Sequence, residues 1–312
     1  MGKMSQSKRP TLRNSSFDSN FWGGFRRVRN IFFEPEDFRE TLDGGQAFTW
    51  NRSESDTDGE PEYIGFFSSC AARLKLDRTG RVWASFPASL NPGDSMRSLE
   101  EYFDLSTDYA RIREELESTG DKHIVRALNR YPTLRILRQN PEETIVSFIC
   151  SSSKRIVQIK QCVGMLAKSM GDKICDGFNR IPDFKRINLS ELEDIKRCKL
   201  GFRAQYLKKS AKKICDDNFD AQRLRTMDYG SAKSYLTSLS GIGEKVADCI
   251  LLFGASRFEA FPVDTWIRKA MDKLYSTGEK PENIRAFARD KFGPYAGFAQ
   301  QLIFASIRND KS

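Results

Sequence analysis

The stretch LSGIGEKVAD, residues 239–248, decides the fold of the larger part of this chain. Apolar residues at three- and four-residue spacing predict a helix over residues 232–239. Gly241 and Gly243 then permit a tight turn that we expect only glycines to allow, and a second helix should begin directly after it. Such a helix-hairpin-helix binds phosphates, because amides at the turn and at the second helix start face a nucleic-acid backbone without reading bases. We therefore predict DNA-backbone contacts from Gly241, Ile242 and Gly243.

Lys245 stands at the second position of the second helix, where the positive end of the helix dipole disfavours a cation. As a plain DNA-binding residue it would contact one more phosphate, and on the hairpin alone that alternative has equal weight. Helix-dipole repulsion and desolvation both lower the pKa of a lysine, so we expect the neutral, nucleophilic amine to be favoured. Cys249 follows one turn later, either against the amine or a bound base or as a buried side chain without a role.

A second segment, AFPVDTW, begins fifteen residues after Lys245. Pro262 fixes the chain immediately before Asp264, and Thr265 can start a helix that contacts the DNA backbone. We expect one amine and one carboxylate, each held near a helix start, to converge at a cleft. The alternative for Asp264 is a helix cap, and the two roles are compatible.

The whole chain of 312 residues is basic: 51 Lys and Arg residues against 42 acidic ones give a net charge of +9. That surplus suits a partner made of phosphates, although a merely basic protein would show it too. Seven dispersed cysteines without a CxxC pair favour reduced thiols over disulfides or a zinc knuckle. The longest apolar runs are well short of the roughly 20 residues of a membrane span. We expect a soluble bacterial cytoplasmic protein associated with the nucleoid, with a nuclear location left open.

Composition divides the chain into three parts. Residues 1–20 form a basic tail without the apolar stretch of a signal peptide, and we expect it to be unstructured. Residues 21–122 contain the β-branched and aromatic runs YIGFF, AARLKL and RVWASF, with a tight hairpin around residues 77–80, and predict a small antiparallel sheet domain. Residues 123–312 predict a larger all-helical domain, so the fold class is α+β. Helices are expected at residues 99–103, 109–116, 124–129, 142–170, 192–198, 204–214, 232–239, 245–253 and 264–274.

Segments distributed over nearly the whole chain resemble the helix-hairpin-helix DNA glycosylases, and most closely the 8-oxoguanine DNA glycosylases. They are GGQAFTW, EYFDL, LRQNPEETIVSFICSS, LGFRAQY, GIGEKVADCILLF, PVDTW and FGPYAGFAQQLIF. The resemblance implies a TBP-like sheet domain and a bifunctional glycosylase and AP lyase, because members of that kind carry lysine at the position of Lys245. The implied substrate is double-stranded DNA containing 8-oxoguanine, bound by a monomer.

The resemblance also implies that no cofactor is required. The iron-sulfur branch of the family needs four closely spaced cysteines near the C-terminus, whereas the last cysteine here is Cys249. We therefore expect no cluster. A monovalent cation at the hairpin carbonyls is the one ion that we allow for.

The implied chemistry uses Lys245 as the nucleophile: its amine attacks C1′ and forms a Schiff base, and β-elimination then nicks the strand. Asp264 stabilises the oxocarbenium-like charge on the sugar. In the pocket for the flipped base, Phe304 stacks, Gln300 contacts the base edge, and the Gly45 carbonyl accepts the N7 hydrogen that 8-oxoguanine has and guanine lacks. Without the resemblance, the first two would be ordinary core residues and the glycine a bend before a strand.

The chain departs from the eukaryotic-type members at the residues that hold the cytosine left in the opposite strand. Ser153 and Gln158 stand where those members have asparagine and arginine, and Phe202 stands where they have tyrosine, while Arg203 is kept. Ser153 is too short to reach the cytosine amine, and Gln158 lacks the charged fork of arginine. We therefore predict excision of 8-oxoguanine opposite cytosine with poor discrimination against other opposite bases.

Two other function classes stay open from the sequence: a related glycosylase for alkylated or differently oxidised bases, and a noncatalytic DNA-binding protein. Lys245 argues against the second of these, and the proposed base pocket argues against the first. Borohydride trapping on duplexes with different lesions distinguishes all three classes.

Overall fold

The computed structural model describes residues 20–53 and 61–309. The basic tail predicted over residues 1–20 lies, apart from Asn20, outside the described residues. The N-terminal domain is a five-stranded antiparallel sheet in the order β1-β5-β4-β3-β2. Its strands are β1 (Arg26–Phe32), β2 (Trp50–Arg52), β3 (Glu62–Phe67), β4 (Cys70–Leu76) and β5 (Arg81–Ser85). The three predicted runs form β3, β4 and β5, which confirms the predicted sheet.

The predicted tight hairpin joins β4 to β5. The Asp77 carboxylate accepts hydrogen bonds from the N–H groups of Thr79 and Arg81, at 2.9 and 3.0 Å, and from Trp83 Nε1 at 2.8 Å. Gly80 adopts a φ of +77°, which suits glycine in the last position of the turn. The turn chemistry of the sequence therefore sets the register of this hairpin.

The remainder of the described chain is helical apart from a two-stranded ribbon of β6 (Lys173–Cys175) and β7 (Phe178–Asn179). The helices of its first half are α1 (Pro35–Asp43), α2 (Pro92–Tyr102), α3 (Tyr109–Ser118), α4 (Lys122–Arg130), α5 (Pro141–Ser151), α6 (Ile156–Met170), α7 (Phe184–Leu189), α8 (Leu192–Ile195) and the π-helix η2 (Lys196–Leu200). Those of its second half are α9 (Arg203–Asp216), the 3-10 helix η3 (Ala221–Arg225), α10 (Tyr229–Thr237), α11 (Glu244–Ala255), α12 (Thr265–Tyr275), α13 (Pro281–Phe292), the 3-10 helix η4 (Gly293–Tyr295) and α14 (Ala296–Asn309). None of these helices is long and apolar enough to cross a membrane.

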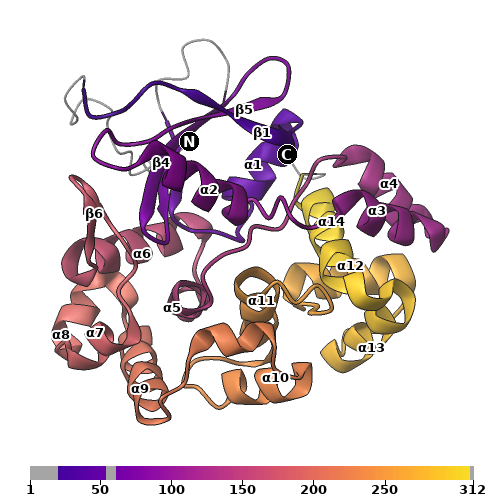
Figure 1. Ribbon diagram of the computed structural model, residues 1–312. Coiled ribbons are helices and arrows are strands. Elements are labelled where there is room, and N and C mark those ends of the chain that lie inside the picture. Colours follow the sequence, from indigo (N-terminus) through magenta and orange to yellow (C-terminus); the bar gives the residue numbers. More distant parts are fainter. Residues whose placement is uncertain (1–19, 54–60, 310–312) are drawn as a thin grey trace, which may run out of the picture.

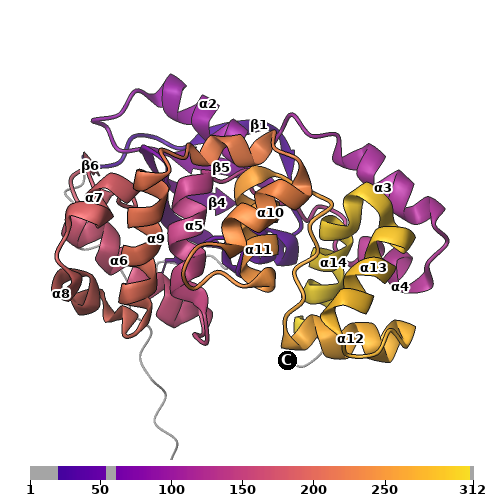
Figure 2. The same ribbon diagram turned by 90° about the horizontal axis from the view of Figure 1, so that it is seen from below.

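Figure 1 shows the sheet domain lying across one side of an arc of helices. Helices α5 and α11, which pack against each other, form the middle of the arc. Helices α6 to α9 lie on one side of them, and α12 to α14 lie on the other together with α3 and α4 (Figure 2). The hairpin between α10 and α11 therefore sits where the two groups of helices meet.

Two of the predicted helices differ from the structure. The run over residues 142–170 is broken into α5 and α6, because Ser152 has a non-helical ψ of 124° and Ser153 adopts a φ of +54° between them. The run over residues 192–198 becomes α8 and a π-helical turn, in which Lys199 adopts a φ of +61°. Helices α1, α7, α13 and α14 lie outside the ranges predicted to be helical.

The division expected at residue 122 does not coincide with the division between the two apolar cores. The apolar side chains of α3, namely Tyr109, Ile112 and Leu116, pack in the helical core, whereas the sheet core ends near Phe103. The cores also exchange one side chain each. Phe48, from the sheet domain, is buried in the helical core, and Leu137, from the linker before α5, is buried in the sheet core.

Candidate active site

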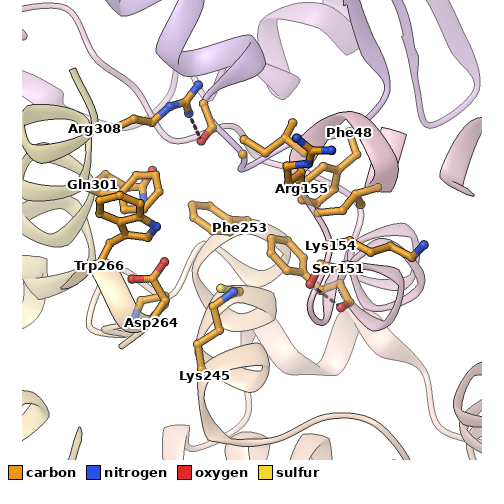
Figure 3. Close-up of a pocket in the computed structure, with 18 of the residues that line it drawn as sticks. Phe48, Ser151, Lys154, Arg155, Lys245, Phe253, Asp264, Trp266, Gln301 and Arg308 are labelled. Carbon is orange, nitrogen blue, oxygen red and sulfur yellow. Dashed lines mark hydrogen bonds between the residues drawn. The ribbon is translucent and has the colours of Figure 1, made fainter. Parts of the chain in front are cut away.

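A cavity of about 570 Å³ opens between the two groups of helices and the loop after α1. The residues that line it include all six predicted catalytic and base-binding residues: Gly45, Lys245, Cys249, Asp264, Gln300 and Phe304. They come from four separate parts of the chain, and Figure 3 shows Lys245 and Asp264 extending into the same space. The structure therefore brings the predicted set together, while the roles of its members remain proposals.

Lys245 is the second residue of α11, as the sequence predicted, and Gly243 occupies the N-cap position. Its amine lies 5.9 Å from the centre of the Phe148 ring. The pKa of Lys245 lies above its ordinary value, because the Cys249 sulfur and the Asp264 carboxylate favour the ammonium ion more than burial disfavours it. The predicted lowering of this pKa is therefore wrong for the free protein, since it weighed the helix dipole and desolvation without the charges of these two neighbours.

Cys249 lies against the Lys245 amine, so the first of its predicted placements is the one observed. The side chain is buried, and burial raises the pKa of the Cys249 thiol to about 11. The raised pKa of Lys245 keeps its amine in the charged form at neutral pH. A proton must leave Lys245 before the amine can act as a nucleophile.

Asp264 is the N-cap of α12, and its Oδ1 accepts a hydrogen bond of 2.8 Å from the N–H of Ile267. The alternative that the sequence left open, a helix cap, is therefore present. Its carboxylate also lies close enough to Lys245 to favour the charged amine. A second hollow of about 370 Å³ adjoins the first, and both are lined by Lys245 and Asp264. Ser153, Thr265 and Arg268 line only the second hollow.

The far side of the cavity is formed by α14 and the loop after α1. Gln300 is buried, and its Oε1 accepts a hydrogen bond of 2.6 Å from Gln301 Nε2. Phe304 lies one turn further along α14 and is only partly buried, which leaves ring surface facing the cavity. Gly45 adopts a φ of +109°, a conformation that side chains rarely allow.

The four residues assigned to the opposite strand lie outside the 570 Å³ cavity and are partly engaged within the protein. Arg203 is buried and donates from Nε and Nη2 to the Ser152 carbonyl, and from Nη1 to the Leu200 carbonyl. Three of its five N–H donors are thus used, and two remain for a base. The Gln158 side chain accepts a hydrogen bond of 3.0 Å from the Arg155 N–H and caps α6.

Phe202 and Ser153 are exposed, as residues that contact DNA must be. Phe202 is 59% exposed, and the Arg203 guanidinium lies 4.3 Å from the centre of its ring. Tyr206 packs edge-on against Phe202 with 5.6 Å between ring centres. An exposed aromatic pair therefore stands beside the hairpin.

The backbone follows the predicted helix-hairpin-helix path, but only one of the two glycines in the turn has a conformation that requires glycine. Gly241 adopts a φ of +81°, and a Cβ there would lie 2.7 Å from the Tyr206 ring. Gly243 has a φ of −93°, which any residue adopts, and a Cβ there would meet nothing within 4 Å. The expectation that both positions need glycine is therefore wrong for Gly243.

Ile242 contributes to the hairpin through its own core contacts. Its side chain is buried, and its N–H donates to the Leu239 carbonyl at 3.2 Å. The N–H predicted to meet a phosphate is thus used within the turn. The Ser240 carbonyl accepts from Ser210 Oγ at 2.9 Å, so part of the carbonyl set that would bind a monovalent cation is already engaged. The cation stays a prediction.

Helix α11 is held from behind by a buried ion cluster. The Asp248 carboxylate, fully buried, accepts a hydrogen bond of 2.6 Å from Tyr229 Oη and lies 2.9 Å from Lys233 Nζ and 3.1 Å from Arg285 Nε. These partners come from α10 and α13. The cluster fixes the rotation of α11 about its axis, and with it the direction of Lys245.

Sequence reasoning did not assign several residues that line the cavity. Trp266, 50% exposed, stands at the rim beside Gln301, and Arg155 and Arg308 lie across the opening from each other (Figure 3). Trp266 belongs to the PVDTW segment, so its place next to Asp264 could have drawn attention to it. The two arginines carry no local signal, because only the tertiary fold brings them here.

Comparison with known proteins matches both halves of the chain to one kind of protein. Residues 31–145 match the family described as 8-oxoguanine DNA glycosylase, N-terminal domain, and residues 146–294 match the HhH-GPD superfamily base excision DNA repair protein. The chain is 30% identical over 242 residues to a probable N-glycosylase/DNA lyase of Methanothermobacter thermautotrophicus, covering 70% of the chain and 76% of that relative. It is 27% identical over 287 residues to the N-glycosylase/DNA lyase OGG1 of Arabidopsis thaliana, covering 85% and 75%.

Solved structures agree with these matches. The chain superposes with a TM-score of 0.79 and 30% identity on the Clostridium acetobutylicum 8-oxoguanine glycosylase/lyase in complex with double-stranded DNA containing cytosine opposite 8-oxoguanine. That match covers 94% of this chain and all of the other. A second structure, MBOgg1 in complex with a low-affinity DNA ligand, superposes with a TM-score of 0.81 and 32% identity, covering 93% and 97%.

Proposed function

The chain belongs to the HhH-GPD superfamily of base excision DNA repair proteins as an 8-oxoguanine DNA glycosylase and lyase, and on this premise we propose how its cavity works. The observation that carries the proposal is the convergence of Lys245 and Asp264 in a cavity that is also lined by the Phe304 ring and by Gly45. A base in a duplex cannot reach this pair, so 8-oxoguanine must flip out of the stack into the 570 Å³ cavity.

We propose that Lys245 acts first as an acid and then as a nucleophile. Its raised pKa means that the amine arrives protonated. As the bond between C1′ and N9 breaks, the departing base takes a proton from the ammonium group, and the released lone pair of Nζ forms a bond to C1′. The C1′–O4′ ring bond of the covalent intermediate then breaks, which leaves a protonated Schiff base at C1′ and a hydroxyl at C4′. Loss of a proton from C2′ and departure of the 3′ phosphate by β-elimination cut the strand on the 3′ side of the lesion.

Asp264 would stabilise the positive charge that develops on the sugar after the C1′–N9 bond begins to break and before the bond from Nζ to C1′ is complete. Its Oδ1 is held by the Ile267 N–H, so the carboxylate is fixed before the reaction begins and needs little reorganisation. In the same proposal Phe304 stacks on the flipped base, Gln300 contacts its edge, and the Gly45 carbonyl accepts the N7 hydrogen. Guanine would instead direct a lone pair at that carbonyl, which is the basis for rejecting it.

We further propose that the enzyme discriminates weakly between opposite bases. The Gln158 Oε1 caps α6, and Arg203 donates three of its N–H groups to backbone carbonyls. Ser153 is too short to reach a base amine. The partner in all steps is double-stranded DNA, bound by a single copy of the chain without a required cofactor.

Borohydride trapping tests the proposal. The protein is mixed with duplexes carrying 8-oxoguanine, an alkyladenine or thymine glycol, reduced, and separated under denaturing conditions. A covalent adduct is expected with 8-oxoguanine, and none with Lys245→Gln, which should still bind the duplex because the basic surface supplies the affinity. Trapping of Lys245→Gln at the wild-type yield would assign the chemistry to another residue, and trapping on a different lesion alone would assign another substrate.

A further inference from the structure

One face of α14 carries three residues at four-residue spacing: Gln300, Phe304 and Arg308. The first two line the cavity as base contacts in the proposed function. Arg308 lies one turn beyond them, and its Nη1 donates a hydrogen bond of 2.7 Å to the Gly44 carbonyl (Figure 3). This bond joins the last helix to the loop after α1, across 264 residues of chain.

We propose that Arg308 is a positioning residue for lesion recognition, because it fixes the peptide group that precedes Gly45. The inference rests on the proposed function, in which that carbonyl distinguishes 8-oxoguanine from guanine. Gly44 C=O and Gly45 N–H belong to one planar peptide group. A guanidinium that holds the oxygen of this group therefore also fixes the positions of the Gly45 N and Cα atoms.

The two neighbours of Gly45 are both held, whereas its own carbonyl is left for a ligand. On the upstream side, the Gly44 N–H donates to the Glu40 carbonyl at 2.9 Å, and a Cβ on Gly44 would lie 2.2 Å from that oxygen. Among the residues that the structure describes, no hydrogen bond is made to the Gly45 carbonyl.

On the downstream side, Gln46 is buried and bonded three times to the linker before α5. Its Nε2 donates to the Arg135 carbonyl at 3.0 Å, and its Oε1 accepts from the Leu137 N–H at 2.8 Å. Its own carbonyl accepts from Gln139 Nε2 at 2.6 Å. These three bonds prevent Gln46 from moving when the backbone at Gly44 changes. On the Gly44 side, the hydrogen bond from Arg308 is the contact that α14 supplies.

Rigidity at this position matters for discrimination. A lone pair on guanine N7 repels the Gly45 carbonyl only if the carbonyl cannot move away, and the N7 hydrogen of 8-oxoguanine gains a bond only if the carbonyl stays in place. A displacement of about 1 Å can cost on the order of 100-fold in rate even when the altered residue does not touch the reacting atoms. Loss of Arg308 should therefore weaken the handling of the base while leaving the lysine chemistry intact.

Arg308 has a second partner that the test must separate. Its Nη1 lies 3.6 Å from the carboxylate of Glu40, which is itself buried. Removing Arg308 alone would leave a buried carboxylate without its cation and could unfold the protein. The double variant Glu40→Gln/Arg308→Met avoids this, and the single variant Glu40→Gln, which keeps the bond to Gly44, is its matched control.

Both variants and the wild type are assayed under single-turnover conditions on two duplexes, one with 8-oxoguanine opposite cytosine and one with a preformed abasic site. Cleavage at the abasic site needs Lys245 but no base. We expect 8-oxoguanine excision by the double variant to fall about 10- to 100-fold below the control, with abasic-site cleavage within about twofold. Equal losses on both duplexes, or no loss on either, would overturn the inference. A wild type that cleaves the abasic site without excising 8-oxoguanine would instead overturn the proposed function.

Discussion

Asp264 combines a structural and an electrostatic role, and two substitutions separate them. Asn at this position can still accept the hydrogen bond from the Ile267 N–H, 2.8 Å in the structure, but carries no charge. Ala loses both the cap and the charge. Replacing a capping Asp by Ala costs about 0.5–2 kcal/mol in stability, whereas Asp→Asn is close to neutral because both residues cap well.

The effect on catalysis should follow the charge instead of the cap. Removing one preorganised group that stabilises developing charge typically slows a reaction about 100- to 1,000-fold, or about 2.7–4 kcal/mol. Asp264→Asn and Asp264→Ala should therefore excise 8-oxoguanine similarly slowly, although only the alanine variant loses stability. Urea unfolding measures the stability of each variant, and single-turnover assays measure its excision rate. An Asp264→Asn variant that excises at the wild-type rate would refute the reasoning and leave Asp264 as a helix cap.

Three further predictions concern the base, the opposite strand and pH. Phe304→Ala should slow excision by an amount equivalent to about 1–3 kcal/mol of lost binding free energy, the usual value of stacking a base on an aromatic ring. An unchanged excision rate at saturating enzyme would make Phe304 a core residue. Excision from four duplexes that differ only in the opposite base should favour cytosine over adenine by less than about a hundredfold, since each lost base contact is worth about 1–3 kcal/mol; a larger preference would mean that other residues hold the opposite base. Burial raises the pKa of Asp37 from 3.8 to about 6, so the folded protein binds this proton more tightly than the unfolded chain and the free energy of unfolding falls as pH rises from about 4 to about 6. Asp37→Asn should remove that loss, so its stability relative to the wild type should grow by about 3 kcal/mol between pH 4 and pH 7, and a pH-independent difference would contradict the shift.

The elements that the sequence predicts well are those specified by neighbouring residues. The hairpin around Asp77 follows from its turn chemistry, and the position of Lys245 in α11 follows from the turn before it. The assignments of Gly45, Gln300 and Phe304 came from the resemblance to a family, and the structure places all three at the cavity.

What the sequence could not provide depends on contacts between distant segments. The direction of the Lys245 pKa shift depends first on Cys249, one turn along the same helix, and then on Asp264, which only the fold brings near. The bond from Arg308 to Gly44 joins opposite ends of the chain and has no local pattern. The break between α5 and α6 was missed because Ser153 adopts a positive φ, although its apolar neighbours keep helical spacing on both sides.

The side chains that the two cores exchange affect how the enzyme unfolds on heating. Phe48 is buried in the helical core and Leu137 in the sheet core, so neither half can lose its structure without opening a cavity in the other. Gly45 lies three residues before Phe48. Heating should therefore melt both halves in a single cooperative transition, with excision lost over the same few degrees. We therefore expect a cell to contain folded, active enzyme and unfolded, inactive enzyme, without a partly unfolded form that binds damaged DNA but does not cleave it.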